Sequence, residues 1–364
     1  MLRAIRATLM RGGTSKGLYF AADDLPTDRR VRDRVLLAAL GSPDPRQIDG
    51  VGGAHPLTSK IAVVGPSTRP DADVDYLFLQ VAIDKAEVSD SQNCGNLLAG
   101  VGPWAIEHGL VPANSPKTSV RIHMVNTASV AIAYVPTPSG TVEYEGDARI
   151  DGVPGTASAI TLEFLDIAGS SCGALLPTGR VIDHVDGLDV TCIDNGMPVV
   201  ILKADDFGIV GDESPETIEL NSELRARIER IRLALGPRMN LGDVTNKTVP
   251  KMSLVSRAKQ GGMINTRTFI PHRVHEAIGV LGAVSVATAC ALPGSVAALV
   301  AEHPPAFGLQ RIDVEHPSGF FTVEMDVAVN PDGSPKVRRS ALLRTTRKLM
   351  TGEVFVKDSA WSAQ

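Results

Sequence analysis

Two similar strings, one in each half of the chain, constrain the fold more than any other feature. Residues 94–99 read Cys-Gly-Asn-Leu-Leu-Ala, residues 281–286 read Leu-Gly-Ala-Val-Ser-Val, and each string opens a segment rich in small apolar residues. These segments predict helices over 97–108 and 283–292, so we expect the two halves to repeat one architecture. A cleft between related halves would receive two helix N-termini, which suits an anion with several carboxylates.

The length of the chain agrees with two domains. At 364 residues it exceeds what one hydrophobic core usually holds. We expect an N-terminal domain over residues 1–180 and a C-terminal domain over residues 181–340. The last strand-like segment, 352–356, is expected to return to the first domain, so that residues 341–364 belong with it.

Strand-like segments outnumber helical ones, which indicates a mixed α/β chain. Further helices are predicted at 31–40, closed by Gly41, and at 215–235, with Ser214 as N-cap. Strands are predicted in the first half at 5–10, 61–64, 76–83, 120–125, 130–135 and 160–165, and in the second half at 190–193, 199–202, 252–255 and 320–327.

Charge and cysteine content exclude several classes of protein. The net charge is −5, and the basic pairs and clusters at 338–339 and 344–348 are short, so we expect them to be solvated and expect no nucleic-acid binding. The 4 cysteines show no C-x-x-C spacing and predict neither a disulfide framework nor a zinc ribbon. No segment resembles a signal peptide or a membrane span, so a cytoplasmic protein is expected.

Cys94 stands where a helix is expected to start, a position that can make a thiol reactive. The first N–H groups of a helix lack intrahelical partners and carry partial positive charge, which favours a thiolate and attracts a carboxylate. Lys60 opens the apolar run 61–64, where burial favours the neutral, basic amine. A thiol and an amine that exchange protons suggest chemistry on a carbon acid. The other three thiols, Cys172, Cys192 and Cys290, are interpreted as structural residues of the core.

Three further patterns receive structural interpretations. Residues 12–17 do not continue into the P-loop pattern G-x-x-x-x-G-K-[ST], because Leu18 and Tyr19 follow the second glycine. Residues 100–105 imitate a dinucleotide fingerprint weakly, but they lie inside a helix pattern. His272 and His275 have no acidic or sulfur ligand close in sequence that would complete a zinc site, so no metal is expected.

Several motifs resemble the methylaconitate cis-trans isomerase (PrpF-like) family, and the resemblance spans nearly the whole chain. They are residues 10–17, 93–96 and 316–319, while the longer strings 46–53, 236–244 and 265–273 resemble the branch of that family acting on 4-oxalomesaconate. The resemblance implies the diaminopimelate-epimerase-like fold, an α/β (α+β) architecture of two pseudo-symmetric domains. Each domain would be a curved mixed sheet around a central helix, with no metal or organic cofactor.

The resemblance places the family's lysine and cysteine on Lys60 and Cys94. The epimerases carry one cysteine in each half, whereas Leu281 stands at the second position here, which argues against two-thiol epimerisation. The family chemistry implied is a 1,3-proton transfer, with Lys60 as base and Cys94 as acid or relay. Backbone N–H groups of Gly95, Asn96, Gly282 and Ala283 would stabilise carboxylates and a developing enolate. The side chains expected to help bind the substrate are Ser15, Lys16, Asn96, Arg267, Arg273 and Ser318.

The expected function is a cofactor-independent isomerase or tautomerase of 4-oxalomesaconate-like acids in the breakdown of gallate, protocatechuate or lignin fragments. The motifs leave double-bond migration and keto–enol tautomerisation open. Two alternatives remain. One is an enzyme for cis-trans isomerisation of 2-methylaconitate in propionate breakdown, and the other is a non-catalytic anion-binding protein. The expected partners are a small di- or tricarboxylate and, in a homo-oligomer, further copies of the chain, but neither nucleic acid nor a membrane.

Overall fold

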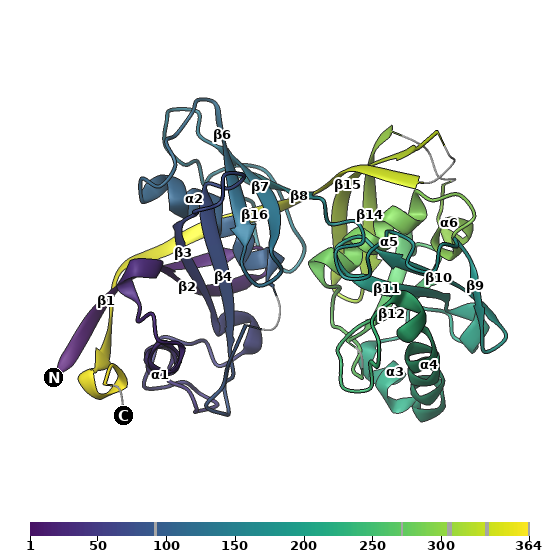
Figure 1. Ribbon diagram of the computed structural model, residues 1–364, viewed down its shortest axis with the longest axis horizontal. Helices are drawn as coiled ribbons and strands as arrows, with labels where there is room; N and C mark the ends of the chain where they lie inside the picture. Colours follow the sequence, from purple (N-terminus) through teal and green to yellow (C-terminus); the bar gives the residue numbers. More distant parts are fainter. Residues whose placement is uncertain (91–92, 271, 304–307, 332–334, 363–364) are drawn as a thin grey trace. The chain divides into compact units, whose positions relative to one another are not determined.

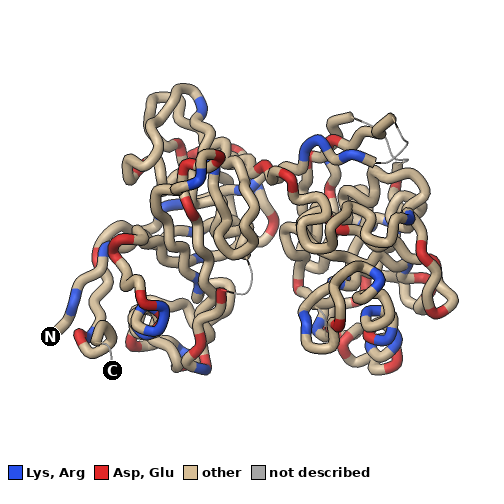
Figure 2. The backbone as a smooth tube through the Cα atoms, in the orientation of Figure 1, with Lys and Arg blue, Asp and Glu red and all other residues tan. Residues whose placement is uncertain are grey.

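The computed structural model describes residues 1–90, 93–270, 272–303, 308–331 and 335–362. The chain forms two compact units, labelled by their elements in Figure 1. Unit 1 comprises residues 1–163 and 343–364, and unit 2 comprises residues 164–342. Basic and acidic residues are interspersed along both units (Figure 2).

Unit 1 wraps a mixed sheet around helix α2 (Gly95–Glu107). Its strands follow the order β1-β2-β3-β4-β6-β7-β8-β16, and β16 also pairs with β1, so they form a closed ring. Every residue of α2 from Leu97 to Ala105 is buried, as a helix that is apolar all round requires. The strands are β1 (Leu2–Gly12), β2 (Ser15–Ala21), β3 (Lys60–Pro66), β4 (Val74–Val81), β5 (Val88–Ser89), β6 (Lys117–Met124), β7 (Ser129–Pro136), β8 (Ala159–Leu165) and β16 (Pro335–Lys357).

Helix α1 (Arg29–Leu40) covers the outer face of the unit 1 sheet. Its buried residues pack against Leu18 of β2 and against Ile61 and Val63 of β3. Because side chains alternate along a strand, the residues between them on β2 and β3 face the other way, towards α2.

Unit 2 repeats this arrangement around helix α5 (Val280–Cys290). In both units five successive pairings are antiparallel, parallel, antiparallel, parallel and antiparallel, with the central helix inside the second parallel crossover. The strands are β9 (Asp183–Val185), β10 (Leu188–Asp194), β11 (Pro198–Lys203), β12 (Lys251–Ser256), β13 (Ile264–Phe269), β14 (Gly308–His316) and β15 (Gly319–Val329), and the other helices are α3 (Pro215–Leu220), α4 (Ser222–Leu235) and α6 (Val296–Val300).

Three local expectations need correction. The helix expected over 215–235 is interrupted at Asn221, which leaves helical geometry and caps α4 by accepting the N–H of Leu224 at 3.0 Å. Helix α5 begins at Val280, earlier than residue 283. Arg344 is 6% exposed rather than solvated, because it lies within the long strand β16, and burial lowers its pKa to about 9.

The segment after β8 joins unit 2 through a buried carboxylate. Asp194 of β10 accepts the backbone N–H groups of Ser171 and Cys172, both at 2.8 Å. Residues 164–182 therefore lie in unit 2, whereas the sequence places the domain boundary near residue 180. None of the described helices is long and apolar enough to cross a membrane.

Two glycines that follow helices give a paired test of loop packing. Gly41 after α1 has φ +79° and Gly109 after α2 has φ +71°, so alanine at either position costs about 1–2 kcal/mol of stability. A Cβ on Gly41 would also lie 2.7 Å from the backbone nitrogen of Gly50, whereas nothing lies within 4 Å at Gly109. We expect Gly41→Ala to lower the free energy of unfolding by about 1–3 kcal/mol more than Gly109→Ala. Urea denaturation measures both, and equal losses would contradict the tight packing of the loop after α1.

Candidate active site

Lys60 is held at the start of β3, on the face of the sheet turned towards α2. It pairs with Gly17 of β2 and Gln80 of β4 in the strand register. The side chain is 7% exposed. Its Nζ donates a hydrogen bond to Oε1 of Gln80 at 2.9 Å and lies 5.0 Å from the centre of the Phe78 ring.

The segment before Lys60 is fixed by a buried glutamine from one of the motifs noted in the sequence. Gln47, which is buried, accepts the Ser59 hydroxyl and the Ala54 N–H through its Oε1, each at 2.8 Å. A Cβ on Gly52 would lie 2.2 Å from that oxygen, so glycine is needed for this close approach. The string 46–53 therefore serves as scaffold for the start of β3.

Cys94 occupies the N-cap position of α2 and is almost buried. Its carbonyl oxygen accepts the N–H of Leu98 at 3.0 Å and the hydroxyl of Tyr76 at 3.1 Å. The N–H groups of Gly95 and Asn96 lie in the first turn, where a helix has no carbonyl to offer them. These donors and the thiol thus come from one short stretch of backbone.

The turn between β1 and β2 packs directly on this first turn of α2. A Cβ on Gly12 would lie 2.4 Å from the carbonyl oxygen of Asn96, and one on Gly13 would lie 2.2 Å from its Oδ1. Arg11 holds the turn from the other side by donating to the carbonyl oxygens of Gly13 at 2.9 Å and Thr345 at 3.0 Å. The string 10–17 therefore packs against the first turn of α2, the helix that Cys94 caps.

Two buried polar atoms next to this turn have no hydrogen-bond partner among the described residues. They are Oγ of Ser15, which is 2% exposed, and Oδ1 of Asn96, whose Nδ2 donates to Thr14 at 3.1 Å. Buried polar groups are normally satisfied, so an unpaired pair marks a place where water or a ligand is expected to bind. Lys16 alternates with Ser15 along β2 and lies on the Leu18 face, away from α2.

Two tyrosines that the sequence did not single out fix the start of α2. Tyr19 donates to the carbonyl oxygen of Leu97 at 2.5 Å, and Tyr76 donates to that of Cys94. Burial raises the pKa of both hydroxyls, and a negative charge on Cys94 raises it further. Both therefore stay protonated donors. Only the strand register, which sequence does not give, reveals their role.

The residues predicted from the second half lie in unit 2, around α5 and β13. The N–H of Ala283 donates to the carbonyl oxygen of Gly279 at 2.8 Å, so this group is already used inside the helix, while Gly282 lies in the first turn. The expected role of the Ala283 N–H is thereby corrected, because α5 starts earlier than expected. Leu281 packs against Gly196, whose added Cβ would lie 3.2 Å from the leucine side chain.

The three side chains predicted to bind substrate in unit 2 differ in their contacts. Arg267 is buried and donates to the carbonyl oxygens of Glu213 at 2.6 Å and Thr266 at 2.8 Å, and burial lowers its pKa. The side chain of Arg273 is 81% exposed and pairs with Glu219 at 3.4 Å. The Ser318 hydroxyl donates to the carbonyl oxygen of Glu276 at 2.8 Å.

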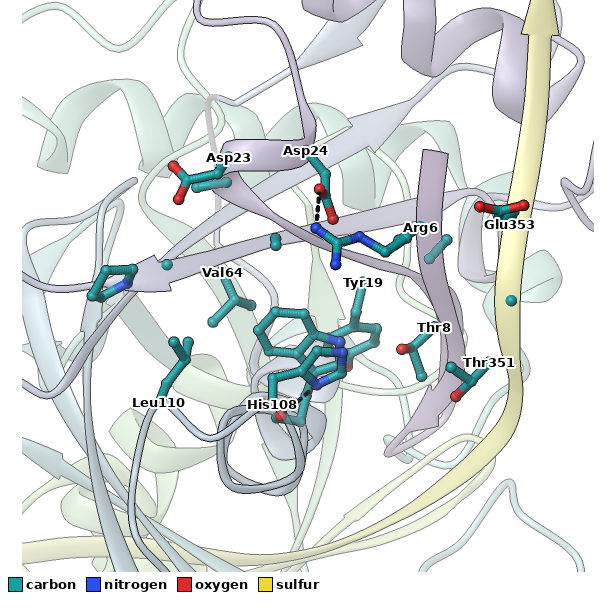
Figure 3. A pocket seen from close by; sticks show the side chains of 17 residues that line it. Arg6, Thr8, Tyr19, Asp23, Asp24, Val64, His108, Leu110, Thr351 and Glu353 are labelled. Carbon is teal, nitrogen blue, oxygen red and sulfur yellow. Dashed lines mark hydrogen bonds and ion pairs between the residues drawn. The ribbon is translucent and has the colours of Figure 1, made fainter. Parts of the chain in front are cut away.

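A cavity of about 540 Å³ in unit 1 lies away from these residues, at the other end of α2. Figure 3 shows Tyr19, Val64, His108 and Leu110 around it, with the Arg6–Asp24 ion pair. Neither Lys60 nor Cys94 lines this cavity. Among the residues described, no group of three or more His, Cys, Asp or Glu side chains is placed to hold a metal ion.

Comparison with known proteins identifies the family. The model of the PrpF protein family matches residues 2–357. The chain belongs to this family. It is 58% identical over 357 residues to a 4-oxalomesaconate tautomerase of Pseudomonas putida, which covers 98% of this chain and 97% of that protein. It is 60% identical over 347 residues to a (4E)-oxalomesaconate Delta-isomerase of Novosphingobium sp. (strain KA1), covering 95% and 96%.

Solved structures confirm the expected fold class. The crystal structure of a methylitaconate-delta-isomerase matches with a TM-score of 0.88 at 34% identity, covering 100% of this chain and 98% of that one. A hydroxyproline epimerase from Agrobacterium vitis matches with a TM-score of 0.54 at 14% identity, which shows a shared fold alone. The PrpF chain is thus an isomerase built on the duplicated epimerase-like architecture.

Thiol reactivity gives a test of this site. All 4 cysteines are free, and burial raises the pKa of Cys172 and Cys290 to about 12 and that of Cys192 further. A pKa of about 12 leaves roughly one thiol in ten thousand ionised at pH 8. We therefore expect iodoacetamide at pH 8 to alkylate Cys94 at least about tenfold faster than the others, as mapped by peptide mass spectrometry. Cys172→Ser should leave the fast phase intact and Cys94→Ser should abolish it, whereas fast labelling at Cys290 would contradict the assignment.

Proposed function

We propose that this PrpF-family isomerase acts on 4-oxalomesaconate by a 1,3-proton transfer, with Lys60 as general base and Cys94 as the acid at the other end. The observation that carries the proposal is local to unit 1. Lys60 lies on the face of the sheet turned towards α2, and Cys94 caps that helix beside its first-turn N–H groups. Two buried polar atoms without a partner among the described residues, Oγ of Ser15 and Oδ1 of Asn96, lie at the turn that packs on this helix start. The identity of 58% and 60% to two relatives named for 4-oxalomesaconate supports the choice of this substrate.

The chemistry follows from the acidity of a carbon between a carbonyl group and a double bond. Neutral Lys60 removes a proton from that carbon, and the electron pair delocalises into a dienolate. Cys94 then gives a proton to the carbon two positions away, which moves the double bond. The proton held by Lys60 passes back to the Cys94 thiolate, so that both substrate and enzyme keep their number of atoms. The N–H groups of Gly95 and Asn96 stabilise the developing oxyanion, while Ser15 and the Asn96 side chain bind a carboxylate.

From unit 2 we retain Gly282 and Arg273 as carboxylate contacts. Gly282 has an N–H in the first turn of α5, and the Arg273 guanidinium is largely exposed with one ion pair. Arg267 and Ser318 bond to backbone carbonyl oxygens of unit 2, so we assign them to supporting the backbone of that unit. Lys16 is kept as a distal electrostatic contact, because its strand position turns it away from α2.

We favour migration of the double bond over keto–enol tautomerisation. The two related proteins carry names for both reactions. Two proton-transfer groups on separate elements, β3 and α2, suit delivery of a proton to a different carbon from the one that lost it. We also propose that the reaction serves aromatic-acid breakdown in the cytoplasm. A relative named 2-methyl-aconitate isomerase from Cupriavidus necator, 36% identical, makes 2-methylaconitate the second candidate substrate.

Proton NMR in D2O tests the reaction directly. We expect purified protein to convert 4-oxalomesaconate into an isomer with new vinyl and methylene signals and with deuterium at the allylic carbon. Faster enol formation alone would replace double-bond migration by tautomerisation. No rate above the uncatalysed one, together with turnover of 2-methylaconitate, would overturn the substrate assignment.

Substitution of the two proton-transfer groups tests their roles. Lys60→Met and Cys94→Ser should each lower kcat by about 10²–10⁴-fold, the usual contribution of general acid–base catalysis. Lys85→Met is the matched control, since Lys85 is exposed and pairs with Glu87 on the surface, and it should retain the parent rate. Unimpaired turnover by Lys60→Met would refute the base assignment.

A further inference from the structure

The hydrogen-bond acceptor of Lys60 is a neutral amide with a fixed orientation. Nε2 of Gln80 donates to the carbonyl oxygens of Pro56 and Ser59, both at 3.1 Å. An amide whose nitrogen is held by two carbonyl oxygens must present its oxygen on the other side, where Nζ of Lys60 lies at 2.9 Å. The orientation of Gln80 is thus determined by the backbone and independent of the state of the amine.

No carboxylate faces Lys60 from the described strands on either side. On β2 and β4 the residues that share its face are Gly17, Tyr19, Tyr76, Phe78 and Gln80. The only acidic residue of β2, β3 and β4 in the described chain is Asp75, which lies on the opposite face and bonds to Ser67. The titratable groups of β2 and β4 that share the face of Lys60 are Tyr19 and Tyr76, and Cys94 precedes α2. Burial keeps both tyrosines neutral, and Tyr144 and Arg11 lie close enough to Tyr19 to act on its hydroxyl.

We propose that Gln80 is a positioning residue for the Lys60 amine, which it holds in place through a neutral acceptor so that the amine is free to lose and regain a proton. This inference rests on the proposed role of Lys60 as general base. The amide oxygen accepts an N–H from the neutral amine and from the ammonium alike. The Phe78 ring adds a weak attraction for the ammonium formed when the substrate loses its proton.

The charge of the acceptor is the decisive property. A carboxylate at 2.9 Å would stabilise the ammonium and keep the base protonated, because an opposite charge within about 4–6 Å favours the charged form. Removal of the acceptor would instead leave Nζ without the bond that orients it. The two kinds of substitution at position 80 therefore have different signatures.

The pH dependence of kcat/KM separates these signatures. In Gln80→Glu the acid limb of the profile, where kcat/KM rises with pH, should move up by about 1–3 pH units. Below this limb kcat/KM should fall about 10–1000-fold, and above it kcat/KM should recover. In Gln80→Met, which has similar size and no amide, kcat should fall about 10–100-fold at every pH without an upward shift of the limb. A Gln80→Met protein with the parent kcat would overturn the proposal, and so would a Gln80→Glu protein in which neither this limb nor the titration of the Lys60 amine moves.

A matched control removes the structural explanation. Asn126 also clamps β4 through an amide, accepting the N–H of Phe78 and donating to the carbonyl oxygens of Phe78 and Asp90. Asn126→Asp loses the same kind of donors without placing a carboxylate at Nζ. It should leave the limb where it is, and an equal shift in Asn126→Asp would assign the effect to general loss of structure.

Direct titration of Lys60 distinguishes failure of this inference from failure of the proposed function. The lysine Cε signals of selectively ¹³C-labelled protein report on each amine, and Lys60→Met assigns the signal of Lys60. We expect the Lys60 titration to move to higher pH in Gln80→Glu, with or without turnover. If it moves while the kcat/KM limb does not, Gln80 positions the amine but Lys60 is not the base. If neither moves, the inference about Gln80 is wrong.

Discussion

Burial of α2 on all sides is the constraint on which unit 1 depends. A helix whose residues from Leu97 to Ala105 are all buried needs apolar partners in every direction, and a single sheet face supplies only half of them. The strands meet this requirement by closing into a ring, which β16 completes by pairing with both β1 and β8. The same enclosure concentrates polar character at the helix start, because the N–H groups of the first turn have no carbonyl partners inside the ring.

The two ends of α2 have opposite electrostatic properties, which is why we propose the start of the helix, and not the cavity, as the reaction site. At the start of the helix, open N–H groups favour an anion. At the other end, the cavity is bordered by Asp23, Asp24 and Glu353, with Arg6 already paired to Asp24. A substrate with several carboxylates is attracted to the first end and repelled at the second. Cavity volume alone would have pointed to the end of α2 opposite Cys94.

Much of the fold, and the placement of Lys60 and Cys94 at the starts of elements, could be predicted from the sequence, because those features are local. Lys60 before an apolar run and Cys94 before a small-residue helix are visible in short windows, and the structure places both residues at element starts. Gln80 and Tyr76 could not be found in this way, since their roles arise from strand pairing. The burial of Arg344 could not be predicted for a similar reason, because a basic string gives no sign that it lies within a buried strand.

Several motifs that carry the family resemblance support Lys60 and Cys94, the residues that we propose to react, without containing either of them. Arg11 ties the Gly12–Gly13 turn to β16, and Gln47 fixes the segment that precedes Lys60. A turn packed within van der Waals distance of helix backbone tolerates no added side chain, which makes such strings recognisable. In this chain, these motifs therefore serve the scaffold around Lys60 and Cys94.

The pairing of β1 with β16 has a consequence for how the chain is made. Unit 2 is continuous in sequence, so it emerges from the ribosome as one stretch. The ring of unit 1, in contrast, lacks a strand until residues 343–357 have been synthesised. Until then β1 presents an unpaired edge, and α2 lies in a barrel that is open along one side. The ring around α2, in the unit that carries Lys60 and Cys94, can therefore close only after this segment has been translated.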